Sequence, residues 1–176
     1  MFYIKTIPSP VGPLYLASDG EALTGLWLEG QKYFAATLDG ETQEQPDLPV
    51  FRQTGAWLET YFSRTPLPAL PPLAPPGSPF RRAVWKLLLE IPYGETSTYG
   101  EITRKLRERG IPTAPQAVGG AVGHNPISIL IPCHRVVGAS GSLTGYAGGI
   151  EKKQFLLALE GVDLTRLYVP KKGTAL

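Results

Sequence analysis

Seven prolines lie within residues 65–79 (TPLPALPPLAPPGSP), and they divide the chain into two halves. Proline has no backbone N–H and a fixed φ, so this stretch can form neither a helix nor a central strand. The composition therefore predicts an extended connector. A ligand for a proline-recognition domain is the alternative interpretation, but a connector between two ordered halves explains the position without requiring a partner.

The first half has the pattern of a small α/β domain. Its first 30 residues alternate short apolar runs with turns that contain Gly, Pro or Asp, which predicts three antiparallel strands. Residues 51–63 place apolar side chains at helical spacing and should form a helix over one face of that sheet. We expect the chain to be organised as an N-terminal domain at 1–64, a connector at 65–77, a C-terminal domain at 78–162 and a tail at 163–176.

The second half is expected to be mainly helical. Ser78 and Pro79 are typical of a helix start. A second helix should cover about 97–109 and end at Gly110, and residues 114–125 form a short, weakly helical segment. Two helices joined by a tight turn that contains glycine predict a helix-turn-helix. The expected fold class is therefore α/β, a small antiparallel sheet with a helix followed by a mainly helical domain.

The end of the second half combines an apolar run, a glycine-rich loop and a helix. Residues 127–132 (ISILIP) have the pattern of a buried strand that runs directly into Cys133. After the loop at 136–149, residues 150–161 predict an amphipathic helix that Gly161 closes. The tail beyond it carries the basic pair Lys171 and Lys172.

A single cysteine among 176 residues excludes a disulfide framework within the chain and makes a reducing cytoplasm the expected compartment. The N-terminus lacks the pattern of a signal peptide, and no stretch approaches the roughly 20 apolar residues of a membrane span. Cys133, His124 and His134 fall short of the about four ligands of structural zinc, so we expect no metal. The net charge of +2 permits a nucleic acid partner without requiring one.

The sequence Pro132-Cys133-His134-Arg135 is the most chemically concentrated part of the chain. An isolated cysteine is most often a buried structural residue. Here the neighbouring polar side chains, and a proline that interrupts strand pairing, instead predict a reactive thiol at an exposed strand end. Only the thiolate attacks carbon, and an imidazole can generate it.

Glu160 lies near the end of the last expected helix, where the helix dipole disfavours a carboxylate unless it has a partner. An imidazole is a suitable partner. Because adjacent side chains in a strand point to opposite faces, Cys133 and His134 need a turn or a bridging water between them. We therefore expect Glu160 to orient His134, and His134 to take the proton of Cys133 through a water.

Taken in order along the chain, these residues resemble the O6-alkylguanine-DNA alkyltransferases. The resemblance covers roughly residues 78–161, and the opening strands more loosely. It depends on a set of matching positions: Asn125-Pro126, Pro132-Cys133-His134-Arg135-Val136, Gly145-Tyr146, Gly148-Gly149, Lys153, Leu156-Leu157 and Glu160-Gly161.

The resemblance implies a DNA repair protein with a ribonuclease H-like first domain and a second domain that carries the helix-turn-helix and the reactive thiol. Such a protein binds double-stranded DNA that contains alkylated guanine, as a monomer and without a cofactor. Its second helix enters the minor groove and the damaged nucleotide is flipped out, since a stacked base cannot be attacked in line. The alkyl group moves from O6 to Cys133 once and irreversibly, because a thioether has no ordinary reductive reversal. O4-alkylthymine is a second candidate substrate.

The resemblance also assigns roles residue by residue. Tyr99 matches the tyrosine that helps to rotate the nucleotide and donates a proton toward N3 of the base, and Asn125 matches a hinge between recognition helix and active site. The backbone carbonyls of Cys133 and Val136 are expected to accept from the exocyclic amine. The remaining assignments are the pocket residues Tyr146, Ala147 and Gly148 and the DNA-binding residues Gln116, Ala117, Gly119, Gly120 and Arg135.

Two departures from the family pattern are visible in the sequence. Gln116 stands where an arginine usually fills the gap left by the flipped base, and glutamine lacks both the charge and the flat guanidinium. Ala147 stands where some members carry a serine, so stabilisation of O6 must rely on backbone amides. We expect the first departure to weaken duplex binding or slow the extrusion of the base.

Three other functions are alternatives to alkyl transfer. An alkyltransferase-like protein that binds the lesion without transfer would have the cysteine replaced, whereas Cys133 is present here. A cysteine hydrolase would need an oxyanion site, for which only the glycine-rich loop offers backbone amides. A helix-turn-helix regulator would leave the Cys-His-Arg cluster unexplained, and its second helix has few side chains able to read bases.

Overall fold

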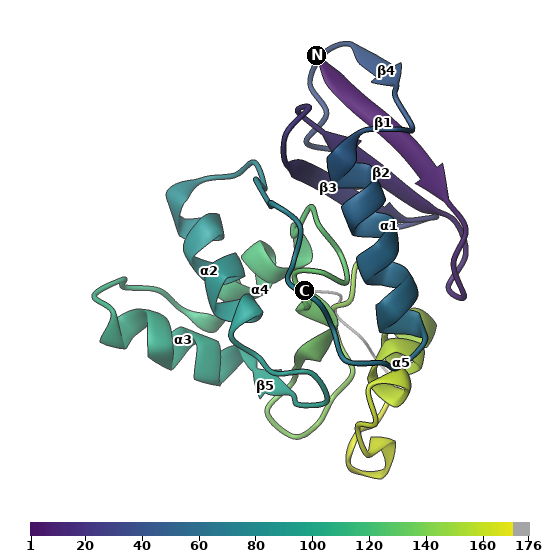
Figure 1. The fold of residues 1–176 in the computed structure, drawn as a ribbon. Helices are drawn as coiled ribbons and strands as arrows, with labels where there is room; N and C mark the ends of the chain where they lie inside the picture. Colours follow the sequence, from purple (N-terminus) through teal and green to yellow (C-terminus); the bar gives the residue numbers. More distant parts are fainter. Residues whose placement is uncertain (171–176) are drawn as a thin grey trace. The chain divides into compact units, whose positions relative to one another are not determined.

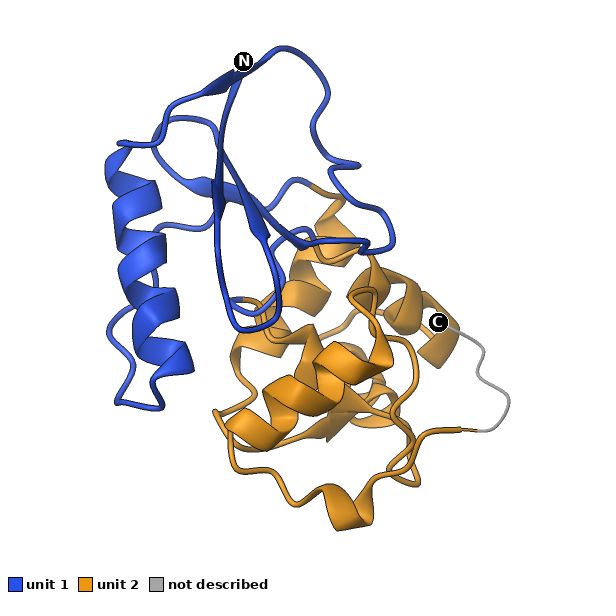
Figure 2. Ribbon diagram, turned by 90° about the vertical axis from the view of Figure 1, so that its right-hand side faces the viewer, with its two compact units in different colours: residues 1–76, 126–130 blue, residues 77–125, 131–176 orange. Residues whose placement is uncertain are grey.

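The computed structural model describes residues 1–170 and divides the chain into two compact units, which Figure 2 shows in different colours. Unit 1 contains residues 1–76 and 126–130, and unit 2 contains residues 77–125 and the chain from 131 onward. The proline-rich segment thus ends at the division between the units. Residues 126–130, which the sequence analysis placed in the C-terminal domain, are part of the first unit.

Unit 1 is built around a four-stranded sheet of order β3-β2-β1-β4 (Figure 1). Strands β1 (Phe2–Ile7), β2 (Leu14–Ser18) and β3 (Leu23–Leu28) are antiparallel, as the alternating pattern predicts. The short edge strand β4 (Thr42–Glu44) is parallel to β1 and was not expected. Its three residues are polar and exposed, so no alternation of apolar side chains marks it in the sequence.

Helix α1 (Pro49–Phe62) lies against β2 and β3, which confirms the expected helix with a start two residues earlier. Proline at its first turn needs no N–H partner and favours a helix start there. The helix buries one stripe of side chains, with the rings of Trp57 and Tyr61 stacked at a centroid distance of 5.4 Å. Spacing of three and four residues is the reason that these side chains share a face.

Backbone hydrogen bonds from two irregular segments satisfy the free edge of β3. In the proline-rich segment Pro72 O accepts from Leu23 N, and Ala74 N donates to Leu23 O, each at 2.8 Å. Farther along, Leu26 N donates to Pro126 O at 2.8 Å and Ser128 N donates to Leu26 O at 3.0 Å. An uncovered strand edge leaves backbone groups unpaired. Residues 126–130 therefore belong with unit 1 because they complete its sheet.

Three helices form the first part of unit 2: α2 (Pro79–Leu89), α3 (Tyr99–Glu108) and α4 (Pro115–Gly123). All three were expected. Ser78 Oγ caps α2 by accepting from Arg81 N at 3.2 Å, and α3 begins with a capping box between Thr98 and Glu101. Helix α4 packs on α2, where the buried indole of Trp85 donates to Ala121 O at 2.8 Å.

The expected strand at 127–132 is wrong. These residues are buried, but they follow a series of turns in which Ile129 has φ 72°, and only an isolated bridge joins Ile127 to Leu26. The run is apolar because it is buried. It does not form a strand because the prolines at both ends lack the backbone N–H groups that pairing with a neighbouring strand requires. The chain then forms one 3₁₀ turn at Cys133–Arg135 (η1) and a short strand β6 (Val136–Val137), which pairs in parallel with β5 (Ser97–Thr98).

The last helix, α5 (Ile150–Leu159), ends two residues before Gly161, whose φ is 83°. A second 3₁₀ turn, η2, covers Leu164–Arg166. The basic pair Lys171 and Lys172 lies outside the described residues. Within residues 1–170, none of the helices has both the length and the apolar character required to cross a bilayer.

Candidate active site around Cys133

Cys133 begins the 3₁₀ turn and is only 5% exposed. The turn is closed by Arg135 N, which donates to Pro132 O at 3.0 Å, and by Val136 N, which donates to Cys133 O. The expectation of an exposed strand end is therefore wrong. Pro132 does end regular pairing, but Ile131 and Val136 on either side of the turn are core residues and carry the thiol inside with them.

The environment of the thiol both hinders and favours its ionisation. Burial raises the pKa of Cys133, whereas the hydrogen bond from the Asn125 side chain and the charge of Lys153 lower it. Asn125 follows α4 and also donates through Nδ2 to Ile131 O at 2.8 Å, so it joins the end of that helix to the chain that leads into Cys133. The buried thiol requires a base to become a nucleophile.

His134 is fully buried and lies on a carboxylate. Its Nε2 is 2.6 Å from Oε2 of Glu160, so the structure brings together the imidazole and the carboxylate that the sequence analysis paired. A carboxylate only accepts, so Nε2 carries the hydrogen and Nδ1 keeps the lone pair. Within residues 1–170, Nδ1 contacts no hydrogen-bond partner.

Burial favours the neutral form of His134. Burial lowers the pKa of His134, and the positive charges of Arg135 and Lys153 lower it further, against the opposite effect of Glu160. A neutral imidazole with a free lone pair on Nδ1 is able to accept a proton at physiological pH. The arrangement therefore has the parts of a nucleophile, a base and a group that orients the base.

Arg135 was expected to bind DNA, and that expectation is wrong. Its side chain is 8% exposed, and its Nε donates to Oε1 of Glu160 at 2.7 Å. Glu160 directly follows α5 and accepts from both His134 and Arg135. Burial by itself would raise the pKa of Glu160, but these hydrogen bonds and charges lower it to about 2. The side chain of Arg135 therefore lies in the interior, where it binds Glu160.

Two tyrosines lie beside this cluster. Tyr99 begins α3, is 7% exposed and donates to Thr144 O at 3.4 Å, and burial raises its pKa to about 12. The ring of Tyr146 meets that of His134 edge to face at a centroid distance of 6.4 Å. Ala147 and Gly148 follow in the same loop and are half-buried. The loop therefore provides a wall and backbone groups next to the imidazole.

Lys153 is a functional candidate to which the sequence analysis assigned no role. Its side chain is fully buried, and its Nζ donates to the carbonyls of Val136 and Thr144. The Val136 carbonyl, expected to accept from a guanine amine, thus already has one donor. Burial lowers the pKa of Lys153 to about 8, while the neighbouring Cys133 favours its charged form. The available signal was its spacing, because Lys153 lies three and four residues before the buried pair Leu156 and Leu157.

The residues expected on the DNA side of α4 divide into two groups. Gln116 and Ala117 are exposed, and Gly120 is half-buried with no atom within 4 Å of the position a β-carbon would occupy. Gly119 is buried on the inner face of the helix, so its expected DNA contact is wrong. With 3.6 residues per turn, Gly119 falls on the inward side together with Val118 and Val122.

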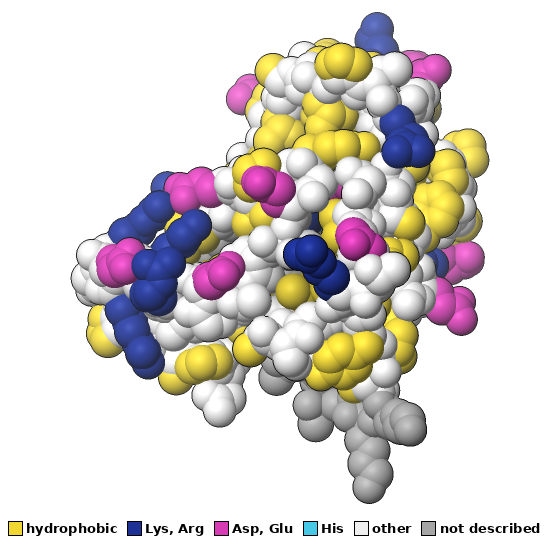
Figure 3. Space-filling model, turned by 90° about the horizontal axis from the view of Figure 1, so that it is seen from below, with side chains coloured by type: hydrophobic (Ala, Val, Ile, Leu, Met, Phe, Trp, Pro, Cys, Tyr) yellow, Lys and Arg dark blue, Asp and Glu magenta, His cyan; other side chains and the backbone are white. Residues whose placement is uncertain are grey.

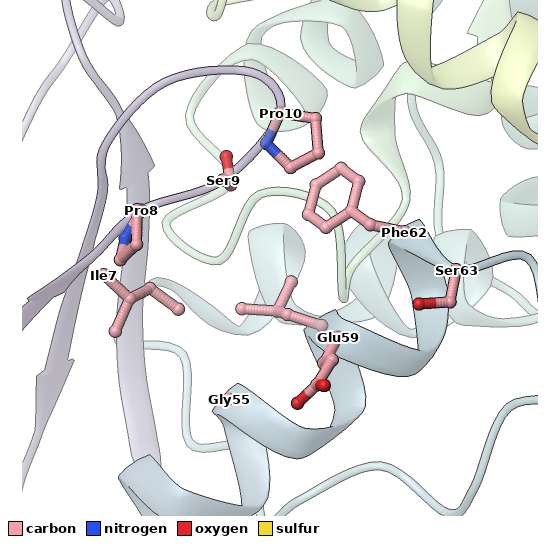
Figure 4. A pocket seen from close by; sticks show the side chains of 9 residues that line it. Ile7, Pro8, Ser9, Pro10, Gly55, Glu59, Phe62 and Ser63 are labelled. Carbon is pink, nitrogen blue, oxygen red and sulfur yellow. The ribbon is translucent and has the colours of Figure 1, made fainter.

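Neither a metal cluster nor a hollow of unit 1 offers a competing site among the described residues. Among residues 1–170, no group of three or more His, Cys, Asp and Glu side chains is placed to hold a metal ion. A hollow of about 560 Å³ lies between the turn at 7–10 and one side of α1 (Figure 4). None of the expected site residues lines it.

Comparison with known proteins supports one family over nearly the whole chain. Residues 79–162 match the 6-O-methylguanine DNA methyltransferase DNA-binding domain, and residues 2–74 match the ribonuclease-like domain of the same methyltransferase. Proteins named methylated-DNA–protein-cysteine methyltransferase are similar throughout. The Haemophilus influenzae protein is 45% identical over 91% of this chain and 87% of its own length. The Methanosarcina acetivorans protein is 44% identical over 90% of this chain and 98% of its own length.

Solved structures agree with these matches. The crystal structure of Mycobacterium tuberculosis OGT in complex with DNA has a TM-score of 0.79 and 44% identity, covering 94% of each chain. The O6-methylguanine-DNA methyltransferase of Pyrococcus kodakaraensis has a TM-score of 0.59 and 25% identity, covering 92% of this chain and all of that one. The matched domains and relatives, together with the buried thiol, imidazole and carboxylate, lead to one conclusion. The chain belongs to the 6-O-methylguanine DNA methyltransferase family.

Proposed function

We propose that this protein repairs DNA by moving the alkyl group of O6-alkylguanine to Sγ of Cys133, one group per protein molecule. The observation that carries the proposal is the arrangement in which Asn125 hydrogen-bonds the thiol of Cys133, and the next residue, His134, is held by the carboxylate of Glu160. The thiol proton passes to Nδ1 of His134 through a water, the S–C bond forms and the C–O6 bond breaks. The guanine leaves protonated, so no cofactor or electron donor is required.

Tyr99 would assist the departure of the base. Its hydroxyl belongs to the group of residues around Cys133, and the raised pKa of about 12 keeps it protonated at physiological pH. Donation toward N3 of the guanine neutralises the negative charge that develops as the C–O6 bond breaks. The proton taken up by His134 then replaces the one that Tyr99 has given to the base, so the net change is the loss of one proton by the thiol and the gain of one by the guanine.

Unit 2 would provide the DNA-binding surface. Its described residues contain 11 Lys and Arg against 7 Asp and Glu, whereas unit 1 contains 4 against 8. Of the Lys and Arg side chains visible in Figure 3, most lie on the left, the side on which Figure 1 places α2 and α3. Positive charge on one unit favours a polyanionic partner. The relative from Mycobacterium tuberculosis was crystallised with DNA.

We propose that α3 and α4 act as a helix-turn-helix whose second helix lies in the minor groove. The exposed positions of Gln116 and Ala117 and the open space at Gly120 support a close approach of the α4 backbone to DNA. Because Cys133 is buried, the damaged nucleotide must leave the stack to reach it. Tyr146, Ala147, Gly148 and the Val136 carbonyl would line the pocket that receives the base. The protein would act as a monomer in the cytoplasm, where its thiol stays reduced.

Mass spectrometry of the intact protein tests this function. Incubation with a duplex that contains O6-methylguanine should add one methyl group to Cys133, with one lesion repaired per molecule. Cys133→Ser should bind the same duplex and remain unmodified. Binding without a mass change would instead identify a lesion-recognition protein, and repair of many lesions per molecule would exclude a thioether end product.

A further inference from the structure

Arg135 makes more contacts than a structural ion pair needs. Its Nε donates to Oε1 of Glu160 at 2.7 Å, its Nη2 donates to Oε2 at 3.2 Å, and its Nη1 donates to Ile91 O at 2.8 Å. The guanidinium also lies 5.8 Å from the ring centroid of Tyr93. The planar fork of arginine can make these bonds at once, and lysine cannot.

Glu160 is saturated by the donors around it. Oε1 accepts from Arg135 and from Gly94 N at 3.1 Å, and Oε2 accepts from Arg135 and from His134 at 2.6 Å. A carboxylate held by four donors cannot rotate about its last bond without losing several of them. The direction in which Oε2 faces His134 is therefore set by the other three donors.

Arg135 and His134 belong to the same 3₁₀ turn as Cys133, so one carboxylate holds two of the three residues of the turn. The bond to Ile91 O and the bond from Gly94 N connect the same group to the loop between α2 and α3. A buried ion pair as a whole adds little stability over hydrophobic residues of similar volume, although removal of one partner is costly. The cost of burying this charge suggests a role in the chemistry of the turn.

We infer that Arg135 is a positioning residue for alkyl transfer: by clamping Glu160 in two places it holds the carboxylate in the one orientation that fixes His134 as the proton acceptor for Cys133. This inference rests on the proposed function. The hydrogen bonds of the Arg135 side chain go to Glu160 and Ile91 O, so it acts through Glu160 and His134.

A positioning role for Arg135 changes the pH dependence of transfer, whereas a purely structural role would not. His134 is faced by Glu160 and Lys153 from α5 and its end, by Arg135 and Cys133 of its own turn, and by the Tyr146 ring from the glycine-rich loop. Removing the guanidinium takes away a positive charge and leaves Glu160 less neutralised. Both changes favour the imidazolium, so a higher pH is needed to obtain the neutral base.

The test is the single-turnover rate of methyl transfer from an O6-methylguanine duplex, at saturating protein, between pH 5 and 9. Arg135→Met should move the acid limb of the profile upward by about one pH unit. Arg135→Lys keeps the charge and loses the fork. It should lower the plateau rate about tenfold or more through misplacement of His134, with little shift of the acid limb. The lysine variant removes no charge from the interior, so it carries the test alone if Arg135→Met does not fold.

Arg52→Met is the matched control, because Arg52 belongs to unit 1, is exposed, and donates from Nε and Nη2 to Asp47 O at 3.2 and 2.9 Å. It should keep the wild-type rate and profile. Wild-type transfer by either Arg135 variant would overturn the inference, as would an equal loss at every pH in Arg135→Met with the acid limb unmoved. Failure of the wild-type protein itself to transfer the methyl group would instead refute the proposed function.

Discussion

Glu160→Gln tests how strongly the buried carboxylate stabilises the fold. The substitution keeps the size of the side chain but removes the charge that accepts from His134, Arg135 and Gly94. In the folded protein the pKa of Glu160 falls from 4.5 to about 2. Because each pH unit of such a change corresponds to about 1.4 kcal/mol, the carboxylate stabilises the fold by about 3 kcal/mol at neutral pH.

The same number gives the sign and range of the pH dependence. A carboxyl whose pKa is lowered by folding contributes its full stabilisation above its ordinary pKa, and loses it as the pH falls through the folded value. For Glu160 the contribution should be complete above pH 5, reduced by about 1 kcal/mol at pH 4 and by about 2 kcal/mol at pH 3. The difference in stability between wild type and Glu160→Gln should shrink by these amounts.

Urea unfolding at pH 7.5, 4 and 3 measures these differences, with tryptophan fluorescence as the signal, since Trp85 of unit 2 is buried. Glu90→Gln is the control, because it breaks a surface pair with Arg109 and should cost below about 1 kcal/mol. The reasoning is refuted if Glu160→Gln costs no more than the control. It is equally refuted if the stability difference is the same at pH 7.5 and at pH 3.

Three further predictions concern DNA and the reaction. Gln116→Arg should accelerate methyl transfer on duplex DNA in a stopped-flow assay, since a guanidinium can stack in the gap left by the base; an unchanged rate would show that Gln116 does not fill that gap. Gly120→Leu should keep or raise the melting temperature, since no atom lies within 4 Å of a β-carbon there and glycine is a poor helix former, yet weaken duplex binding at least about tenfold by fluorescence anisotropy. Equal affinity would place this face of α4 away from DNA. Tyr99→Phe should slow transfer about a hundredfold at pH 7.5 without weakening lesion binding, because the proton donor is lost; a wild-type rate would remove Tyr99 from the reaction.

Local signals predicted the helices well. Ser78 precedes Pro79 at the start of α2, and Thr98 lies three residues before Glu101 at the start of α3. Each cap satisfies the first N–H groups of its helix within a single turn, so no distant residue is needed to recognise it. Edge strand β4 carries no such signal, because its three exposed residues pair through backbone atoms alone. The apolar run at 127–132 predicted burial correctly. An apolar pattern cannot, however, distinguish a strand from a buried series of turns.

The candidate site could be predicted in its composition more than in its arrangement. A carboxylate at the end of a helix is unfavourable without a partner, and from that rule alone Glu160 could be paired with His134. The environment of Arg135 and Gly119 could not be obtained in this way. Arginine beside a reactive cysteine fits DNA binding and a buried clamp equally well, and glycine on a short helix fits either face.

The sequence by itself determined the candidate residues around Cys133 and the capped helices, because each depends on chemistry within a few neighbouring positions. Only the tertiary structure decided that the thiol is buried, that Lys153 bonds the carbonyls of Val136 and Thr144, and that Glu160 accepts from four donors. The four donors reach Glu160 because segments far apart in the chain meet at this carboxylate. These segments are Gly94, the turn at 133–135 and the end of α5. A polar side chain in the interior takes its role from the partners that folding brings to it.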